Sequence, residues 1–174
     1  MSKESGFLRP YFAYGERTPK VLGAIIGRDL EVESSTLYDH RLYIQRSSDV
    51  DPAVRDILGE PRTLEELDAF RAYVAVPEEG SHIKGAVTEL SPSELDLVDY
   101  YDINGLWFVR RNGLLASVGQ PKRLARVSAH ILAFPASLDT VPSYEGRFPE
   151  PLNDVGRTLE IARGARTAFL AEQK

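Results

Sequence analysis

Strand-like segments dominate this chain, and helical patterns do not follow them one by one. Four segments are apolar or alternate between apolar and polar residues as strands do: residues 7–14, 35–45, 82–90 and 123–134. A parallel α/β sheet would need a helix after nearly every strand. The order of segments therefore predicts an α+β fold, a small mixed β-barrel with a few flanking helices.

The first quarter of the chain is predicted to consist of strands joined by loops, and the apolar run 21–26 belongs to it. Two helices are then expected, over residues 51–61 and 63–74. Thr63 and Glu66 form a capping box that would open the second of these helices. Strand-rich and helical regions thus follow each other in blocks.

Asn112-Gly113 is a dipeptide typical of two-residue hairpin turns. It is therefore predicted to join a strand at residues 106–111 to a second strand at 114–118. Residues 135–152 contain four prolines and little periodicity, which predicts a long loop or lid. A last helix, capped by Asn153 or Asp154, is expected to run to about residue 171. We expect residues 1–134 to form the domain, with the loop and helix of 135–174 packed on it.

The clearest helix signal lies at residues 91–102. Ser91 and Glu94 form a capping box, with a proline at the first helical position. Leu95, Val98 and Asp102 then share one face of the predicted helix. Asp102 would thus be a carboxylate on an apolar face at the negative end of the helix dipole, and such surroundings favour a general base.

Composition narrows the function classes. The 26 acidic and 21 basic residues give a net charge of −5, and a nucleic-acid-binding protein more often has a basic excess. No apolar run approaches the roughly 20 residues that cross a membrane, and the first ten residues lack the apolar stretch of a secretory signal. We therefore expect a cytoplasmic protein that binds neither nucleic acid nor membrane. A homodimer stays open.

Several kinds of catalytic centre have no sequence support. The chain has no cysteine, which excludes thiol nucleophiles and cysteine-ligated metals. Its three histidines, His40, His82 and His130, have no metal-ligand spacing. No nucleotide-binding motif or serine-nucleophile motif occurs. We expect neither a metal nor a cofactor.

Two local features could bind or transform a small molecule. Tyr14-Gly15 ends a predicted strand and opens a polar loop whose backbone N–H groups could face an anion. Asp99 and Asp102 lie in the last turn of the predicted helix. Glycine at a strand end and aspartate at a helix end are each common for structural reasons alone, so neither feature is specific by itself.

The order of these features is more specific. The relevant pieces are, in chain order, Phe12-Ala13-Tyr14-Gly15, residues 35–42, residues 83–87, residues 94–102 and residues 108–110. Over residues 8–134 this succession resembles the gamma-glutamylcyclotransferase-like family. The resemblance implies a small mixed barrel with a cavity at one end. It also implies a cofactor-free reaction, in which the α-amine of a γ-glutamyl group attacks its own side-chain carbonyl to give 5-oxoproline and a free amine.

The resemblance also implies roles for particular residues. Asp102 would be the general base, in place of the family's glutamate. The residues that would line the substrate are Tyr14, Gly15, Glu16, Arg17, Thr18 and Phe108. Arg17 could bind a substrate carboxylate.

Three positions depart from the family pattern. Glu16 replaces a small polar residue, Asp102 replaces the glutamate and Phe108 replaces a tyrosine. Two functions therefore stay open: a cyclotransferase that acts on a γ-glutamyl or related amide, and an inactive small-molecule-binding or protein-interaction module on the same scaffold. If Asp102 is the base, Asp102→Asn is expected to stop turnover and to leave the melting temperature within a few degrees.

Overall fold

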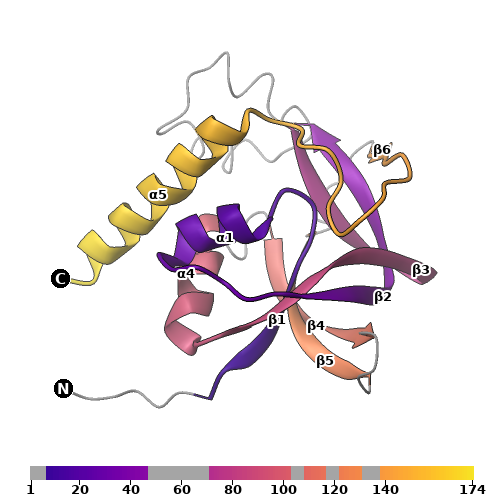
Figure 1. Cartoon of the computed structure of the whole chain (residues 1–174), viewed down its shortest axis with the longest axis horizontal. Coiled ribbons are helices and arrows are strands. Elements are labelled where there is room, and N and C mark those ends of the chain that lie inside the picture. The colour runs from indigo at the N-terminus through magenta and orange to yellow at the C-terminus, as the bar shows by residue number, and fades with distance from the viewer. Residues whose placement is uncertain (1–6, 47–70, 103–107, 117–121, 131–137) are drawn as a thin grey trace.

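The computed structural model describes residues 7–46, 71–102, 108–116, 122–130 and 138–174 (Figure 1). In these residues the strands are β1 (Arg9–Ala13), β2 (Glu33–Arg46), β3 (Arg71–Leu90), β4 (Phe108–Ala116), β5 (Arg123–His130) and β6 (Asp139–Thr140). The helices are α1 (Pro19–Ile26), α4 (Pro92–Asp102) and α5 (Val155–Glu172).

The strands close into a mixed barrel. β1 pairs antiparallel with β3 and parallel with β5. β3 pairs with β2, β2 with β4, and β4 with β5, all antiparallel, so the circuit returns to β1. The short strand β6 adds to the far end of β2. This arrangement, with helices on one side of the barrel (Figure 1), confirms the predicted α+β barrel.

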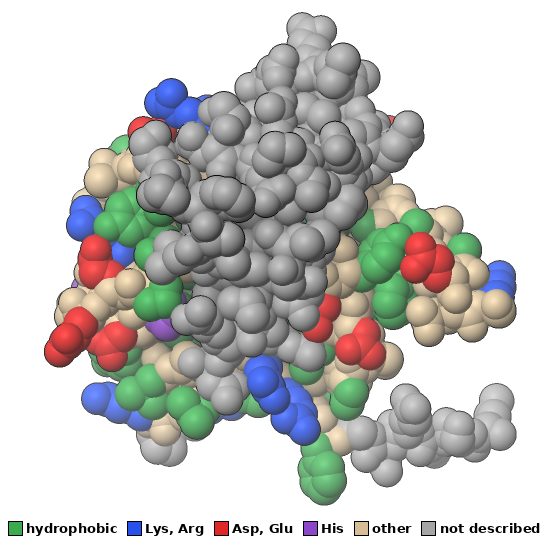
Figure 2. All heavy atoms as spheres, turned by 180° about the vertical axis from the view of Figure 1, so that it is seen from behind, with side chains coloured by type: hydrophobic (Ala, Val, Ile, Leu, Met, Phe, Trp, Pro, Cys, Tyr) green, Lys and Arg blue, Asp and Glu red, His purple; other side chains and the backbone are tan. Residues whose placement is uncertain are grey.

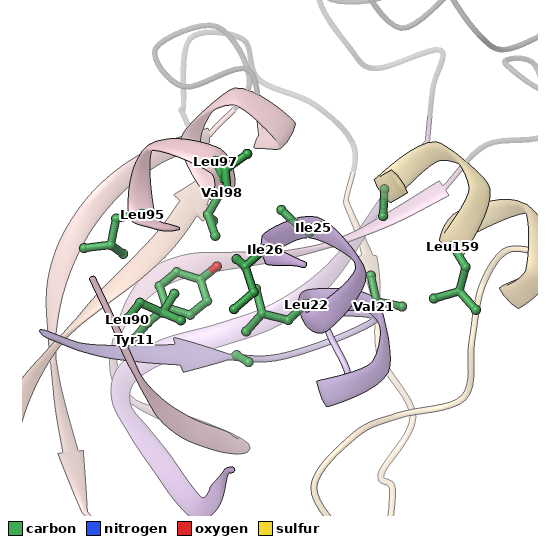
Figure 3. Close-up of a cluster of buried hydrophobic side chains, with 12 residues drawn as sticks. Tyr11, Val21, Leu22, Ile25, Ile26, Leu90, Leu95, Leu97, Val98 and Leu159 are labelled. Carbon is green, nitrogen blue, oxygen red and sulfur yellow. The ribbon is translucent and has the colours of Figure 1, made fainter. Parts of the chain in front are cut away.

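β1 separates two apolar cores because its side chains alternate between faces. Phe12 and Tyr14 point to the barrel interior, where they pack with residues such as Leu37. Tyr11 and Ala13 belong to the other cluster, beneath the helices. Figure 3 shows Tyr11 between β1 and the side chains of α1 and α4. β1 is therefore the barrel strand that has one face in the barrel interior and the other beneath the helical layer.

The prediction of a strand-and-loop first quarter is wrong for residues 21–26, which lie in α1. The Thr18 side chain caps the helix by accepting a hydrogen bond from the Val21 N–H, and Pro19 occupies the first helical position. Gly27 ends the helix in the left-handed conformation. The Thr-Pro pair is a helix-start signal, which the short apolar run obscured.

The predicted hairpin at Asn112-Gly113 is also wrong. Both residues lie within β4, which pairs with β5 from Phe108 to Leu115. A Cβ on Gly113 would lie 2.4 Å from Leu37 Cδ1, in the barrel interior. The glycine therefore makes room for a core side chain inside a strand, and tertiary packing outweighs the local turn preference.

The remaining predicted elements have mixed outcomes. Residues 71–74 begin β3 and are not helical, while 51–61, 63–70 and 131–134 lie outside the described residues. The helix predicted at 91–102 is confirmed as α4, with Ser91 and Glu94 bonded to each other's backbone N–H as a capping box requires. The last helix is confirmed as α5, with Asp154 as its cap.

The proline-rich C-terminal segment crosses from the barrel to the helical layer. Val141, Tyr144 and Leu152 pack against the barrel core, and α5 then packs against α1. Seen from behind (Figure 2), the described surface mixes acidic, basic and apolar side chains. No described helix is both long and apolar enough to span a membrane.

Candidate functional site

The loop that joins β1 to α1 is short, and three of its residues are fixed in different ways. The Tyr14 hydroxyl accepts a hydrogen bond from the Ala75 N–H at 3.1 Å. Gly15 has a φ of +67°, and a Cβ there would lie 2.6 Å from Tyr73 Cβ, so both the conformation and the space favour glycine. The Arg17 N–H donates to the Tyr14 carbonyl at 3.1 Å and closes a tight turn.

Arg17 and Asp102 form an ion pair between this loop and the end of α4. Arg17 Nη1 donates to Asp102 Oδ2 at 2.8 Å, and Nη2 bonds to Oδ1, so both carboxylate oxygens are engaged. The Asp102 side chain is 2% exposed and that of Arg17 is 12% exposed. This two-pronged geometry is the strong form of an arginine–carboxylate contact.

Tyrosines surround the guanidinium. Arg17 Nη1 also donates to the Tyr11 hydroxyl at 3.0 Å, and the guanidinium carbon lies 5.6 Å from the centre of the Tyr101 ring. Burial alone would lower the pKa of Arg17, but the oxygens of Tyr11, Tyr14 and Tyr101 outweigh it and hold the pKa above its ordinary value. Burial raises the pKa of Tyr14 well above its usual range. Arg17 is therefore a fixed positive charge, and Tyr14 stays neutral.

The helix explains where Asp102 lies. Leu95, Val98 and Asp102 are all buried on one face of α4, as their spacing predicts. Asp102 is the last residue of the helix, where the helix dipole disfavours a carboxylate. The positive charge of Arg17 offsets both this and the cost of burial.

Glu16 points away from Arg17, toward the C-terminal segment. Its Oε1 accepts hydrogen bonds from the backbone N–H groups of Leu152 and Asn153, the second at 2.8 Å. Its Oε2 accepts from Asn153 Nδ2 at 2.8 Å. A small cavity of about 50 Å³ opens beside these contacts. Gly15, Glu16 and Thr18 line it together with residues from 149–158, and Asp102 does not.

The fold has counterparts among solved structures. A gamma-glutamyl cyclotransferase superposes with a TM-score of 0.54 at 14% identity, over 72% of this chain and 68% of that one. The chain has the gamma-glutamylcyclotransferase-like fold. An Arabidopsis thaliana protein known from a solution structure matches at 0.53 and 19% identity, over 100% of this chain and 93% of its own. A second one matches at 0.52 and 15%, over 75% of this chain and 66% of its own.

At identities this low, the superpositions establish that the chain shares the cyclotransferase fold, and a shared fold does not by itself assign an activity. No protein-family model matches the chain, and no curated protein matches it.

On this cyclotransferase fold, the structure brings most of the predicted site residues into one loop and one helix end. Tyr14 to Thr18 lie together, and Arg17 reaches Asp102 across 85 positions of sequence. Phe108 is the first residue of β4 and pairs with His130 in β5. Asp99, the other candidate acid, is half-buried on α4.

Sequence reasoning missed three residues around the site. Tyr11 and Tyr101 contact the Arg17 guanidinium, and Asn153 holds Glu16. Tyr101 could have been found, because it directly precedes Asp102 in the motif. In the part of the chain that the structure describes, no group of three or more His, Cys, Asp or Glu side chains could hold a metal ion.

Proposed function

We propose that this protein binds a γ-glutamyl amide at the Arg17–Asp102 pair and cyclises it to 5-oxoproline, with release of the amine. The observation that carries the proposal is the Asp102 carboxylate, buried at the end of α4 and held against the loop that follows Tyr14-Gly15. The shared fold with a gamma-glutamyl cyclotransferase supports it. In this proposal Asp102 is the general base, and the loop binds the substrate.

The substrate has the charges needed to open the ion pair. A γ-glutamyl group has a free carboxylate and a free ammonium on the same carbon. The carboxylate would take the Arg17 guanidinium, and the ammonium would take Asp102. One buried ion pair is then replaced by two, which matters because breaking such a pair without replacement costs about 3–5 kcal/mol. The partial exposure of Arg17 gives the substrate carboxylate its approach.

The reaction then needs only positioning and proton transfer. Asp102 takes a proton from the substrate ammonium, and the resulting amine attacks the γ-carbonyl carbon. The new C–N bond closes the five-membered ring. The C–N bond to the leaving group breaks as Asp102 returns its proton to the leaving nitrogen. The second proton lost by the attacking nitrogen also passes to the released amine, which leaves as an ammonium ion.

One observation favours a second candidate, an inactive binding module on the same scaffold. Arg17 already engages both oxygens of Asp102. If no substrate displaces it, Asp102 cannot accept a proton, and the pair has only a structural role. A small-molecule ligand or a protein partner would then bind elsewhere on the fold. A cytoplasmic location and a homodimer stay predictions from the sequence.

The deciding experiment measures 5-oxoproline release from a panel of γ-glutamyl amines and peptides. Asp102→Asn should abolish release, and Asp102→Glu should retain it. Arg17→Lys keeps the charge and loses the two-pronged geometry, so it should raise KM more than it lowers kcat. No release from any member of the panel would reject the cyclotransferase proposal in favour of the binding module.

A further inference from the structure

Glu16 and Arg17 are neighbours in the loop that joins β1 to α1. Their side chains contact different parts of the chain, Arg17 the end of α4 at Asp102 and Glu16 the C-terminal segment. Glu16 is half-buried and accepts three hydrogen bonds from Leu152 and Asn153. A carboxylate with so many partners is fixed in place, and the backbone between it and Arg17 is fixed with it.

Asn153 is equally constrained. Its Nδ2 donates to the Arg71 carbonyl at 2.7 Å as well as to Glu16, and its Oδ1 accepts from the Arg71 N–H at 3.3 Å. The side-chain amide thus pairs with the first residue of β3 as a neighbouring strand would. Close by, the Tyr73 hydroxyl donates to the Glu150 carbonyl at 2.5 Å. Asn153 therefore joins Glu16 to the rigid barrel.

We infer that Glu16 and Asn153 are positioning residues that hold Arg17 in its pair with Asp102. We call their mutual contacts the Glu16–Asn153 clamp. The residue before Glu16 is Gly15, which has a positive φ. Tyr14 and the Thr18 cap of α1 anchor the two ends of the loop, and the clamp anchors it between them. The C-terminal segment thus sets the geometry of the candidate site.

The inference deepens the proposed function, in which Arg17 and Asp102 bind the substrate. Its test reads the ion pair directly and does not need turnover. If the protein shows no turnover, the proposed function is rejected. The signal of the ion pair then still supports or refutes the role of Glu16 and Asn153.

The experiment reverses the donor and acceptor of the clamp. Glu16→Gln places an amide donor against the Asn153 amide, and Asn153→Asp places a carboxylate against Glu16. The double variant restores a donor–acceptor match between residues 16 and 153. Like Asn153→Asp alone, it leaves the Arg71 carbonyl without its side-chain donor. The readout is the ¹⁵N–¹H signal of the Arg17 guanidinium, which a two-pronged ion pair protects from exchange with water. Asp102→Asn identifies that signal by removing it.

We expect each single variant to lose the protected Arg17 signal. The double variant should protect it better than Asn153→Asp alone, because both lack the bond to the Arg71 carbonyl and only the double variant restores the contact between residues 16 and 153. Asp139→Asn is the matched control. Asp139 lies in the same C-terminal segment as Asn153, and the substitution breaks its exposed 3.0 Å pair with Arg46 of β2 without changing the loop between β1 and α1. It should keep the signal. Rescue by the double variant separates positioning from a general loss of stability.

The inference is overturned if either single variant keeps the parent signal, or if the double variant protects the signal no better than Asn153→Asp alone. Asn153→Ala covers the case in which the charged variants do not fold. It removes the three side-chain bonds without adding a charge and leaves the two backbone bonds to Glu16. It should weaken the protected signal, and an unchanged signal would equally overturn the inference.

Discussion

Removing either partner of the Arg17–Asp102 pair is predicted to destabilise the protein, and by different amounts for the two partners. Arg17→Met leaves a carboxylate that is 2% exposed, whereas Asp102→Asn leaves a guanidinium that is 12% exposed. After Asp102→Asn, the guanidinium still has the Tyr11 hydroxyl and the Tyr101 ring as partners. Loss of the arginine should therefore be the more costly change.

The structure sets the size of the effect. Removing one partner of a buried ion pair typically costs about 3–5 kcal/mol. Arg17→Met should fall in this range. Asp102→Asn should cost about 2–3 kcal/mol, because the exposed edge of Arg17 and its tyrosine contacts reduce the penalty. The double variant Arg17→Met, Asp102→Leu removes both charges and should unfold within about 1 kcal/mol of the parent, or be more stable.

Urea unfolding followed by circular dichroism measures these free energies. The parent, Arg17→Met, Asp102→Leu and the double variant form a double-mutant cycle, and Asp102→Asn is measured beside them. In a domain of this size, 1 kcal/mol corresponds to about 2–4 °C of melting temperature. Asp102→Asn should therefore lower the melting temperature by roughly 4–12 °C. This replaces the sequence-based expectation of a shift of only a few degrees, which took no account of a buried partner.

If both single variants unfold within about 0.5 kcal/mol of the parent, the range of surface substitutions, the Arg17–Asp102 pair does not stabilise the protein as a buried ion pair would. If the double variant is as unstable as the sum of the two singles, the residues do not interact.

Two further predictions concern the barrel. Gly113→Ala should destabilise the protein by about 1–3 kcal/mol in urea unfolding, because the new Cβ would lie 2.4 Å from Leu37 Cδ1. The control is Gly164→Ala on α5, where a Cβ has open space around it, and this variant should not lose stability. Burial raises the pKa of Tyr144 from its ordinary 10.0 to about 12, so its contribution to stability is complete below pH 10 and is lost between pH 10 and 12. Between pH 10 and 12, Tyr144→Phe should therefore reduce the slope of unfolding free energy against pH by an amount that corresponds to at most one proton. A slope equal to that of the parent would contradict this.

Local signals predicted α4 and α5, which begin with a capping side chain, but they did not predict α1, although Thr18 caps it. They also failed where tertiary contacts decide. The capping box at Ser91 and the cap at Asp154 each mark a true helix start. Asn112-Gly113 has a strong local preference for a hairpin turn. It nevertheless lies within β4, because the barrel interior needs a residue without Cβ next to Leu37. A turn preference of this kind is small compared with the packing of a whole strand.

The site divides in the same way. The spacing of Leu95, Val98 and Asp102 places the carboxylate on the buried face of α4, as the sequence predicts. The sequence pattern cannot supply its partner, because Arg17 lies 85 residues away. It likewise cannot show that Glu16 faces Asn153, 137 residues along the chain. Charged side chains reveal their partners only once the fold brings them together.

Two of the three residues that depart from the cyclotransferase pattern, Glu16 and Asp102, each have a partner in this structure. Asn153 is the partner of Glu16, and Arg17 is the partner of Asp102. Glu16→Ser would restore the family's small polar residue but leave the Asn153 N–H without its carboxylate acceptor, and such an unsatisfied group costs about 1–3 kcal/mol. A return to the family pattern at Glu16 alone should therefore weaken the loop, and a test of activity by this reversion has to change Asn153 as well.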